Sequence, residues 1–164
     1  MKRTKKIALS LALVMLLCLL AACGGGSAAR NDVAVKDISD AIAAALGNEN
    51  FVEPPESYIT GSMKINPSAF VEYRIQMNSK GVNIDEFGVF KGKDADDTAK
   101  IQQTVKDYLA YRDESWMPEY MPEERPKLDS AQVKTMGNYV IYVILSDDNS
   151  KLAIGEFEKA LKSE

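Results

Sequence analysis

The stretch GNYVIYVIL (residues 137–145) sets the fold class of this chain. Gly137 and Asn138 are typical of a two-residue hairpin turn with glycine at its first central position. The seven residues that follow, 139–145, are apolar at odd and even positions alike. A strand with two apolar faces is typical of the centre of a sheet. The turn therefore predicts a central strand at 139–145, paired with a short strand at 131–136.

A second hairpin is expected earlier in the chain. Residues 70–77 alternate between apolar and polar side chains, the pattern of a strand with one buried face. A turn at 78–81 leads to another strand at 82–91. Between residues 48 and 69 we expect mainly irregular structure, because Pro54-Pro55 excludes a helix or a central strand. Asn66-Pro67 can begin a single helical turn there.

Three segments have the apolar spacing of amphipathic helices, namely residues 33–46, 94–114 and 148–162. Gly47 lies where a helix-ending glycine is expected. The order is one helix followed by two β-β-α units. This order predicts a single α+β domain at 33–164, with an antiparallel sheet of about four strands and helices packed on one face.

The first thirty residues predict export and a lipid anchor. Lys and Arg dominate residues 2–6, and residues 7–20 are apolar apart from one serine, which is the pattern of a signal peptide too short to span a membrane. The ending LAAC (residues 20–23) resembles the lipobox of bacterial lipoproteins. That resemblance implies cleavage between Ala22 and Cys23 and a diacylglyceryl group on the Cys23 thiol.

The expected plan therefore has a signal peptide at 1–22, a lipidated cysteine with a flexible tether at 23–32, and the folded domain after it. The predicted location is the extracytoplasmic face of the cell membrane, where acylated Cys23 holds the protein in the bilayer.

Composition after this processing limits the function. Loss of residues 1–22 leaves 16 basic against 24 acidic residues, a formal charge of −8, which argues against nucleic acid as a partner. The chain contains no His, and lipidation of Cys23 would leave no free thiol. Ser-His-Asp and Cys-His catalysis are thereby excluded, and we expect no metal and no cofactor.

Glu86 is the candidate functional acid. The alternation of apolar residues changes phase near Asp85-Glu86, which indicates either a β-bulge or a Glu86 side chain on the apolar face. Such a carboxylate could point into a site, or it could form a salt bridge with Arg74 or Arg112. For a glycosidase, Glu72 and Glu86 form the one carboxylate pair on neighbouring strands that we would name.

The stretch WMPEYMPEERP (residues 116–126) is the candidate partner-binding segment. Its prolines, four residues apart, are expected to prevent regular structure. Large apolar area comes from Trp116, Met117, Tyr120 and Met121, which could bind a partner or fold back as a lid on the core. The acidic clusters at 94–97 and 147–149 lack the spacing of a calcium loop and are better interpreted as helix caps.

Four short segments resemble one known family: EFGVFK (86–91), YLAYR (108–112), the loop residues around PEE (122–124), and GNYV (137–140). They look like small Gram-positive lipoproteins of the family called domain of unknown function 4358, and the likeness extends from about residue 33 to the end. This resemblance implies no established activity and therefore no catalytic residues.

The expected function is that of a lipid-anchored, non-enzymatic binding or assembly module of the cell envelope, whose partner is an envelope protein or a wall component. Two alternatives remain open at the level of sequence. One is a carboxylate-dependent cell-wall hydrolase. The other is a small solute-binding lipoprotein, although some 130 residues are few for a two-lobed receptor.

Overall fold

The computed structural model of the chain describes residues 29–47, 50–80 and 82–162. Its elements follow in the order α2 (Val35–Leu46), β1 (Phe51–Val52), α3 (Glu56–Gly61), the 3₁₀ turn η1 (Pro67–Ala69), β2 (Glu72–Asn78), β3 (Glu86–Lys91), α4 (Ala95–Glu114), α5 (Arg125–Asp129), β4 (Gln132–Met136), β5 (Tyr139–Ile144) and α6 (Asp147–Leu161).

The strands form one antiparallel sheet in the order β1-β2-β3-β5-β4. β3 and β5 lie inside the sheet, and β1 and β4 form its edges. The α+β class is confirmed, and so is an interior position for the strand after Gly137. The expected four strands become five, because the two-residue edge strand β1 lies in a segment that we expected to be a loop.

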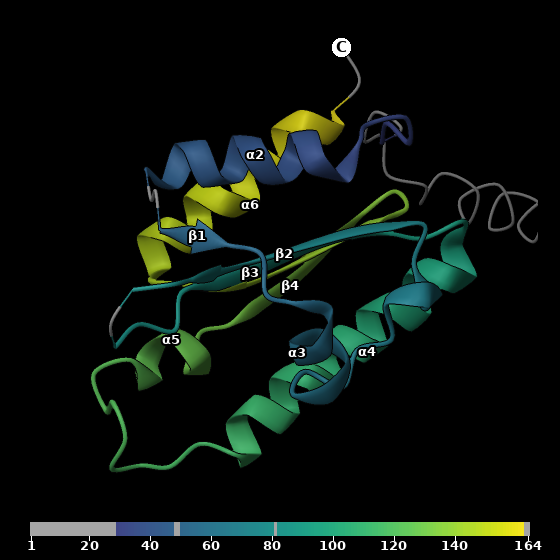
Figure 1. Cartoon of the computed structure of the whole chain (residues 1–164). Helices are drawn as coiled ribbons and strands as arrows, with labels where there is room; N and C mark the ends of the chain where they lie inside the picture. Colours follow the sequence, from purple (N-terminus) through teal and green to yellow (C-terminus); the bar gives the residue numbers. More distant parts are fainter. Residues whose placement is uncertain (1–28, 48–49, 81, 163–164) are drawn as a thin grey trace, which may run out of the picture.

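Helices cover both faces of the sheet, so the expected single helical layer is wrong. Figure 1 shows α2 and α6 on one side of the sheet and α3 and α4 on the other. The reason lies in the central strands. In β3, Phe87 and Val89 face the α2–α6 layer, whereas Phe90 packs in the opposite cluster with α4. β5 divides its side chains in the same way, and two apolar faces require two covering layers.

The main helices agree with the sequence patterns. α2, α4 and α6 begin and end within about two residues of the expected positions. Gly47 adopts a φ of 60° after α2, which is the left-handed conformation that glycine adopts readily. α3 was not expected, and β3 begins at Glu86, four residues later than predicted. Both differences arise in short segments, where local patterns carry little information.

The chain enters the domain at the end of the sheet that carries the β4–β5 turn. The N–H of Arg30 donates to the Leu161 carbonyl over 2.9 Å, and the hydroxyl of Tyr139 donates to the Val33 carbonyl over 2.6 Å. A Cβ on Gly137 would come within 2.8 Å of the Ala29 side chain. These contacts hold residues 29–33 against the domain at one defined end.

Candidate functional site

A carboxylate cluster made of Glu86, Tyr108, Arg112 and Tyr142 lies between the sheet and α4. Glu86 is fully buried at the start of β3. Its Oε1 accepts hydrogen bonds from the hydroxyls of Tyr142 and Tyr108, the latter over 2.7 Å, and its Oε2 pairs with Nη1 of Arg112 over 2.9 Å. The same guanidinium contacts the Tyr108 hydroxyl over 2.8 Å. The buried charge is therefore paired and hydrogen-bonded, as burial requires.

Local structure explains how three elements meet at this point. Tyr108 and Arg112 are four residues apart on α4 and so lie on one helix face. Gly88 stands opposite Tyr142 in the β3–β5 ladder. A Cβ at Gly88 would lie 2.4 Å from a carbon of the Tyr142 ring. Glycine at this position therefore leaves room for the ring, whose hydroxyl donates to Glu86.

Burial and charge act on the pKa values of the two tyrosines and the arginine of this cluster. Burial raises the pKa of both Tyr108 and Tyr142 well above the usual range, and the charge of Glu86 raises each further. Burial alone would lower the pKa of Arg112, but the charge of Glu86 and the Tyr108 hydroxyl together outweigh it, and the pKa is raised. Arg112 therefore stays charged and both hydroxyls stay neutral donors.

This geometry favours the salt-bridge interpretation of Glu86. β3 pairs with β2 in unbroken register from Glu86 onward, so the change of phase reflects a carboxylate on the apolar face, and no bulge interrupts the strand there. Arg112 is the partner of Glu86, whereas Arg74 pairs with Asp40 and Glu53. A fully buried carboxylate whose oxygens are occupied has no open path to a substrate.

The proposed carboxylate pair of Glu72 and Glu86 is wrong. Glu72 pairs with Lys91 and Glu86 with Met77, so the two acids stand at opposite ends of the β2–β3 ladder. Five residues of strand separate them, about 17 Å, far beyond the separation that either glycosidase mechanism needs. Glu72 instead accepts the N–H of Val35 over 2.8 Å and caps the start of α2.

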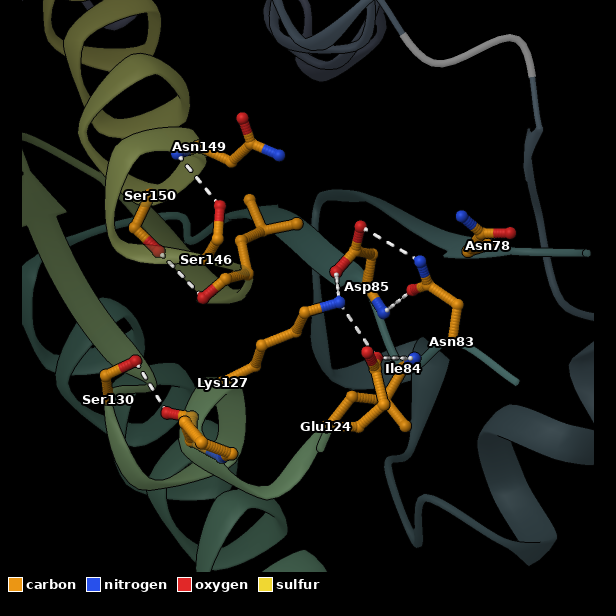
Figure 2. A network of polar contacts seen from close by, with 12 residues as sticks. Asn78, Asn83, Ile84, Asp85, Glu124, Lys127, Ser130, Ser146, Asn149 and Ser150 are labelled. Carbon is orange, nitrogen blue, oxygen red and sulfur yellow. Dashed lines mark hydrogen bonds and ion pairs between the residues drawn. The ribbon is translucent and has the colours of Figure 1, made fainter. Parts of the chain in front are cut away.

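A second polar cluster, formed by Asp85, Glu124 and Lys127, was missed by sequence reasoning (Figure 2). Nζ of Lys127 lies 2.8 Å from a carboxylate oxygen of Asp85 and 2.8 Å from one of Glu124. Glu124 also accepts the N–H of Ile84 over 2.9 Å. Burial lowers the pKa of Lys127, but hydrogen bonds to the two acids raise it more, so the ammonium is stabilised. The cluster joins α5 to the chain just before β3.

Local sequence gave one signal for this cluster, the spacing of three residues between Glu124 and Lys127. Asp85 lies about forty residues earlier, and its contact depends on the fold.

The candidate partner-binding segment divides into buried and exposed parts. Trp116 is half-buried against the α4 side of the core, with the Arg125 guanidinium 6.0 Å from its ring centre. Met117 and Tyr120 are 63% and 58% exposed, and Met121 is half-buried. The lid interpretation therefore fits Trp116, and the surface interpretation fits Met117 and Tyr120.

Proline did not prevent regular structure throughout this segment. Pro126 lies in the first turn of α5, where its missing N–H costs no hydrogen bond and its fixed φ suits a helix. The expectation of an irregular stretch as far as residue 126 is corrected accordingly: the helix starts at Arg125.

The acidic clusters act at helix starts, as expected. The Asp94 side chain accepts the N–H of Asp97 over 2.8 Å and caps α4. At α6 the cap is Ser146, and the acids Asp147 and Asp148 occupy the first turn, where they complement the helix dipole. Within residues 29–47, 50–80 and 82–162, no group of three or more His, Cys, Asp or Glu side chains is arranged to hold a metal ion.

The predicted anchor lies outside the described residues: Ala22, Cys23, the signal peptide 1–22 and all of the tether before Ala29. Among the helices that the structure describes, none combines the length and the apolar character needed to cross a membrane.

Fold and site together define a three-layer α+β domain with a buried carboxylate cluster and an exposed apolar loop. The chain belongs to the family described as Domain of unknown function (DUF4358), whose model matches residues 45–145. The family noted in the sequence is thus confirmed over these residues, whereas the lipoprotein anchor stays a prediction. Neither the curated proteins nor the solved structures contain a match to this chain.

Proposed function

We propose that this protein is a lipid-anchored, extracytoplasmic module of the cell envelope that binds a protein or wall component without catalysing a reaction. One observation carries the proposal. Two large apolar side chains, Met117 and Tyr120, are exposed on the loop after α4, at the end of the domain away from the chain entry. Exposed Met and Tyr side chains are typical of surfaces that contact partners.

The position of this loop follows from α4. The helix starts near the β4–β5 turn, where the side-chain amide of Asn138 donates to the Lys93 carbonyl over 3.1 Å. It ends at Glu114, just before the loop, and Figure 1 shows it running diagonally across the sheet. Its twenty residues cover about 30 Å. The loop is therefore about one helix length from the end at which residues 29–33 are held.

An anchor at Cys23 would orient the domain. Five residues separate Cys23 from Ala29, and this length of chain reaches about 20 Å at most. The chain-entry end would then lie close to the bilayer, while the loop with Met117 and Tyr120 would point away from it. Two acyl chains suffice for stable anchoring.

The chemistry of the loop indicates a partner with basic character. Glu119 and Glu123 are exposed on either side of Tyr120. The two alternative functions gain no support from the geometry: Glu72 and Glu86 form no catalytic pair, and the described residues form one layered domain with no second lobe.

A photo-crosslinking experiment tests the proposal. A benzophenone amino acid replaces Tyr120 in the lipid-anchored chain in its native membrane, and the matched control carries it at Leu152, which is 50% exposed on α6. We expect one envelope component to be captured from position 120 and not from position 152. Equal capture at both positions, or capture at neither, would contradict a binding role for the loop.

A further inference from the structure

The outer edge of β2 is covered along only part of its length. β1 pairs with Asn78 and Met77 alone. The pairing ends at Val52; the same register, extended, would bring Pro54 opposite Ile75, which is itself buried. Beyond that point Tyr73 is only half-buried and Val71 is 48% exposed. An uncovered stretch of sheet edge therefore lies at the start of β2.

Backbone alternation shows which groups face outward there. The N–H of Asn78 donates to Asp85 next to β3, and that of Ser79 donates to Asn50 next to β1, both over 2.9 Å. Because successive residues of an antiparallel strand direct their backbone groups to opposite sides, even-numbered residues of β2 bond to β3. The N–H and C=O of Tyr73 therefore point outward, where no strand of the described residues pairs with them. Just before β2 the alternation is interrupted, since the N–H of Val71 also donates to the Lys91 carbonyl of β3, over 3.0 Å.

Two hollows flank this uncovered edge, and both are lined by Tyr73 and Arg74. One, of about 410 Å³, has an apolar wall at Pro67, Phe70 and Val71 and is also lined by the oppositely charged Lys36 and Glu72. The other, of about 340 Å³, extends between Glu53, Glu56 and Ile59. A chain lying along the edge would place alternate side chains in surroundings of different character.

Charge distinguishes the two hollows. Arg74 is already paired with Asp40 and Glu53, and Glu56 has no ion pair among the described residues. Glu56 is exposed at the start of α3. Burial, together with the negative charges of Glu56 and Glu53, raises the pKa of the Tyr73 hydroxyl, which agrees with a negative potential at this point. A basic side chain is the complement of that hollow.

We propose that the edge at Val71–Arg74 is a peptide-binding surface, on which an extended segment of a partner protein adds as a short strand. The peptide bonds to the outward N–H and C=O of Tyr73. It places a basic side chain beside Glu56 and an apolar one beside Val71. Strand addition takes its affinity from main-chain bonds and its specificity from pockets for alternate side chains. This surface is separate from the loop at Tyr120, and the proposal does not depend on the function of that loop.

Amide hydrogen exchange measured by NMR on the mature lipidated chain in detergent micelles tests the backbone geometry first. In the free protein, we expect the amide of Tyr73 to exchange at least about tenfold faster than that of Arg74, which bonds to β3. Comparable protection of the two amides would show that the edge is already occupied and would overturn the proposal.

Two synthetic heptapeptides then test the partner: one alternates valine with lysine, the other valine with glutamate. The lysine peptide is expected to slow exchange at Tyr73 by about tenfold at saturation, and the glutamate peptide to have little effect. Equal protection of the Tyr73 amide by both peptides would overturn the proposal. NMR chemical-shift changes confined to Met117 and Tyr120 would overturn it as well. Protection that rises with protein concentration alone would identify a second copy as the occupant and would also overturn it.

Variants with matched controls complete the test. Val71→Lys places a positive charge on the edge and should weaken binding of the lysine peptide by about tenfold. Val82→Lys, at a comparably exposed valine at the other end of the hairpin, should leave it unchanged. Glu56→Gln should weaken binding about two- to fivefold, whereas Glu114→Gln should not. Equal effects of Val71→Lys and Val82→Lys would contradict the assigned position.

Discussion

Removing the cation of the buried carboxylate cluster is the most direct test of what holds this domain together. In Arg112→Met the aliphatic stem is largely kept, but Glu86 remains buried with only two tyrosine hydroxyls as donors. Removal of one partner of a buried ion pair costs about 3–5 kcal/mol. Because the Arg112 side chain is 18% exposed, water can partly replace it, and we expect a loss near the lower limit, about 3 kcal/mol.

This loss is large for a domain of such size. Total stability of small domains is about 5–15 kcal/mol. With an unfolding entropy of about 2.1 cal/mol/K per residue over roughly 130 residues, 3 kcal/mol lowers Tm by about 11 °C. Thermal and urea unfolding at pH 7, followed by circular dichroism, measures both quantities.

A second variant separates charge from packing. Glu86→Gln combined with Arg112→Met removes the uncompensated charge and keeps an acceptor for Tyr108, so the double variant should be more stable than Arg112→Met alone by at least about 1 kcal/mol. Lys151→Met removes an ion pair whose two side chains are 76% and 92% exposed, and stability should change by less than about 0.5 kcal/mol. A structural role for the Arg112 charge would be refuted if the free energy of unfolding of Arg112→Met equalled that of Lys151→Met, or if the double variant were the least stable of the three.

Three further predictions concern the loop, the tyrosines and the anchor. Trp116→Ala should lower the free energy of unfolding by about 2 kcal/mol, roughly half the loss for a fully buried Trp. Tyr120→Ala should change it by less than about 0.5 kcal/mol. Equal unfolding midpoints for the two variants would contradict the assignment of Trp116 to the core and of Tyr120 to the surface. Stability should fall as pH rises above about 10, because Tyr142 ionises in the unfolded chain but, with its raised pKa, stays neutral in the fold. In Tyr142→Phe the free energy of unfolding should fall less steeply with pH, measured by urea unfolding between pH 8 and 11. An unchanged dependence on pH would contradict the role given to Tyr142. Cys23→Ala should release the protein from membranes or leave the signal peptide uncut; a variant still cleaved after Ala22 and membrane-bound on fractionation would show that Cys23 is not the anchor.

The sequence alone determined the elements whose signals are local. The period of α2, α4 and α6, the left-handed glycine at 47 and the Gly137-Asn138 turn depend on neighbouring residues, and each is present in the fold. The two apolar faces of residues 139–145 also indicated an interior strand. The same pattern already required helices on both faces, a consequence that only the assembled sheet made plain.

Tertiary structure decided everything that depends on residues far apart in the chain. Glu86 meets donors 22, 26 and 56 positions away, and Glu72 caps a helix 37 positions before it. Strand β1 has only two residues, too few to show a periodic pattern in the sequence. It is a strand because it pairs with β2, which the sequence alone does not reveal. Trp116 and Tyr120 have similar chemistry in one loop, yet one packs on the core and the other faces solvent. Which side chain is buried depends on where the sheet and α5 lie, and no pattern of neighbouring residues contains that information.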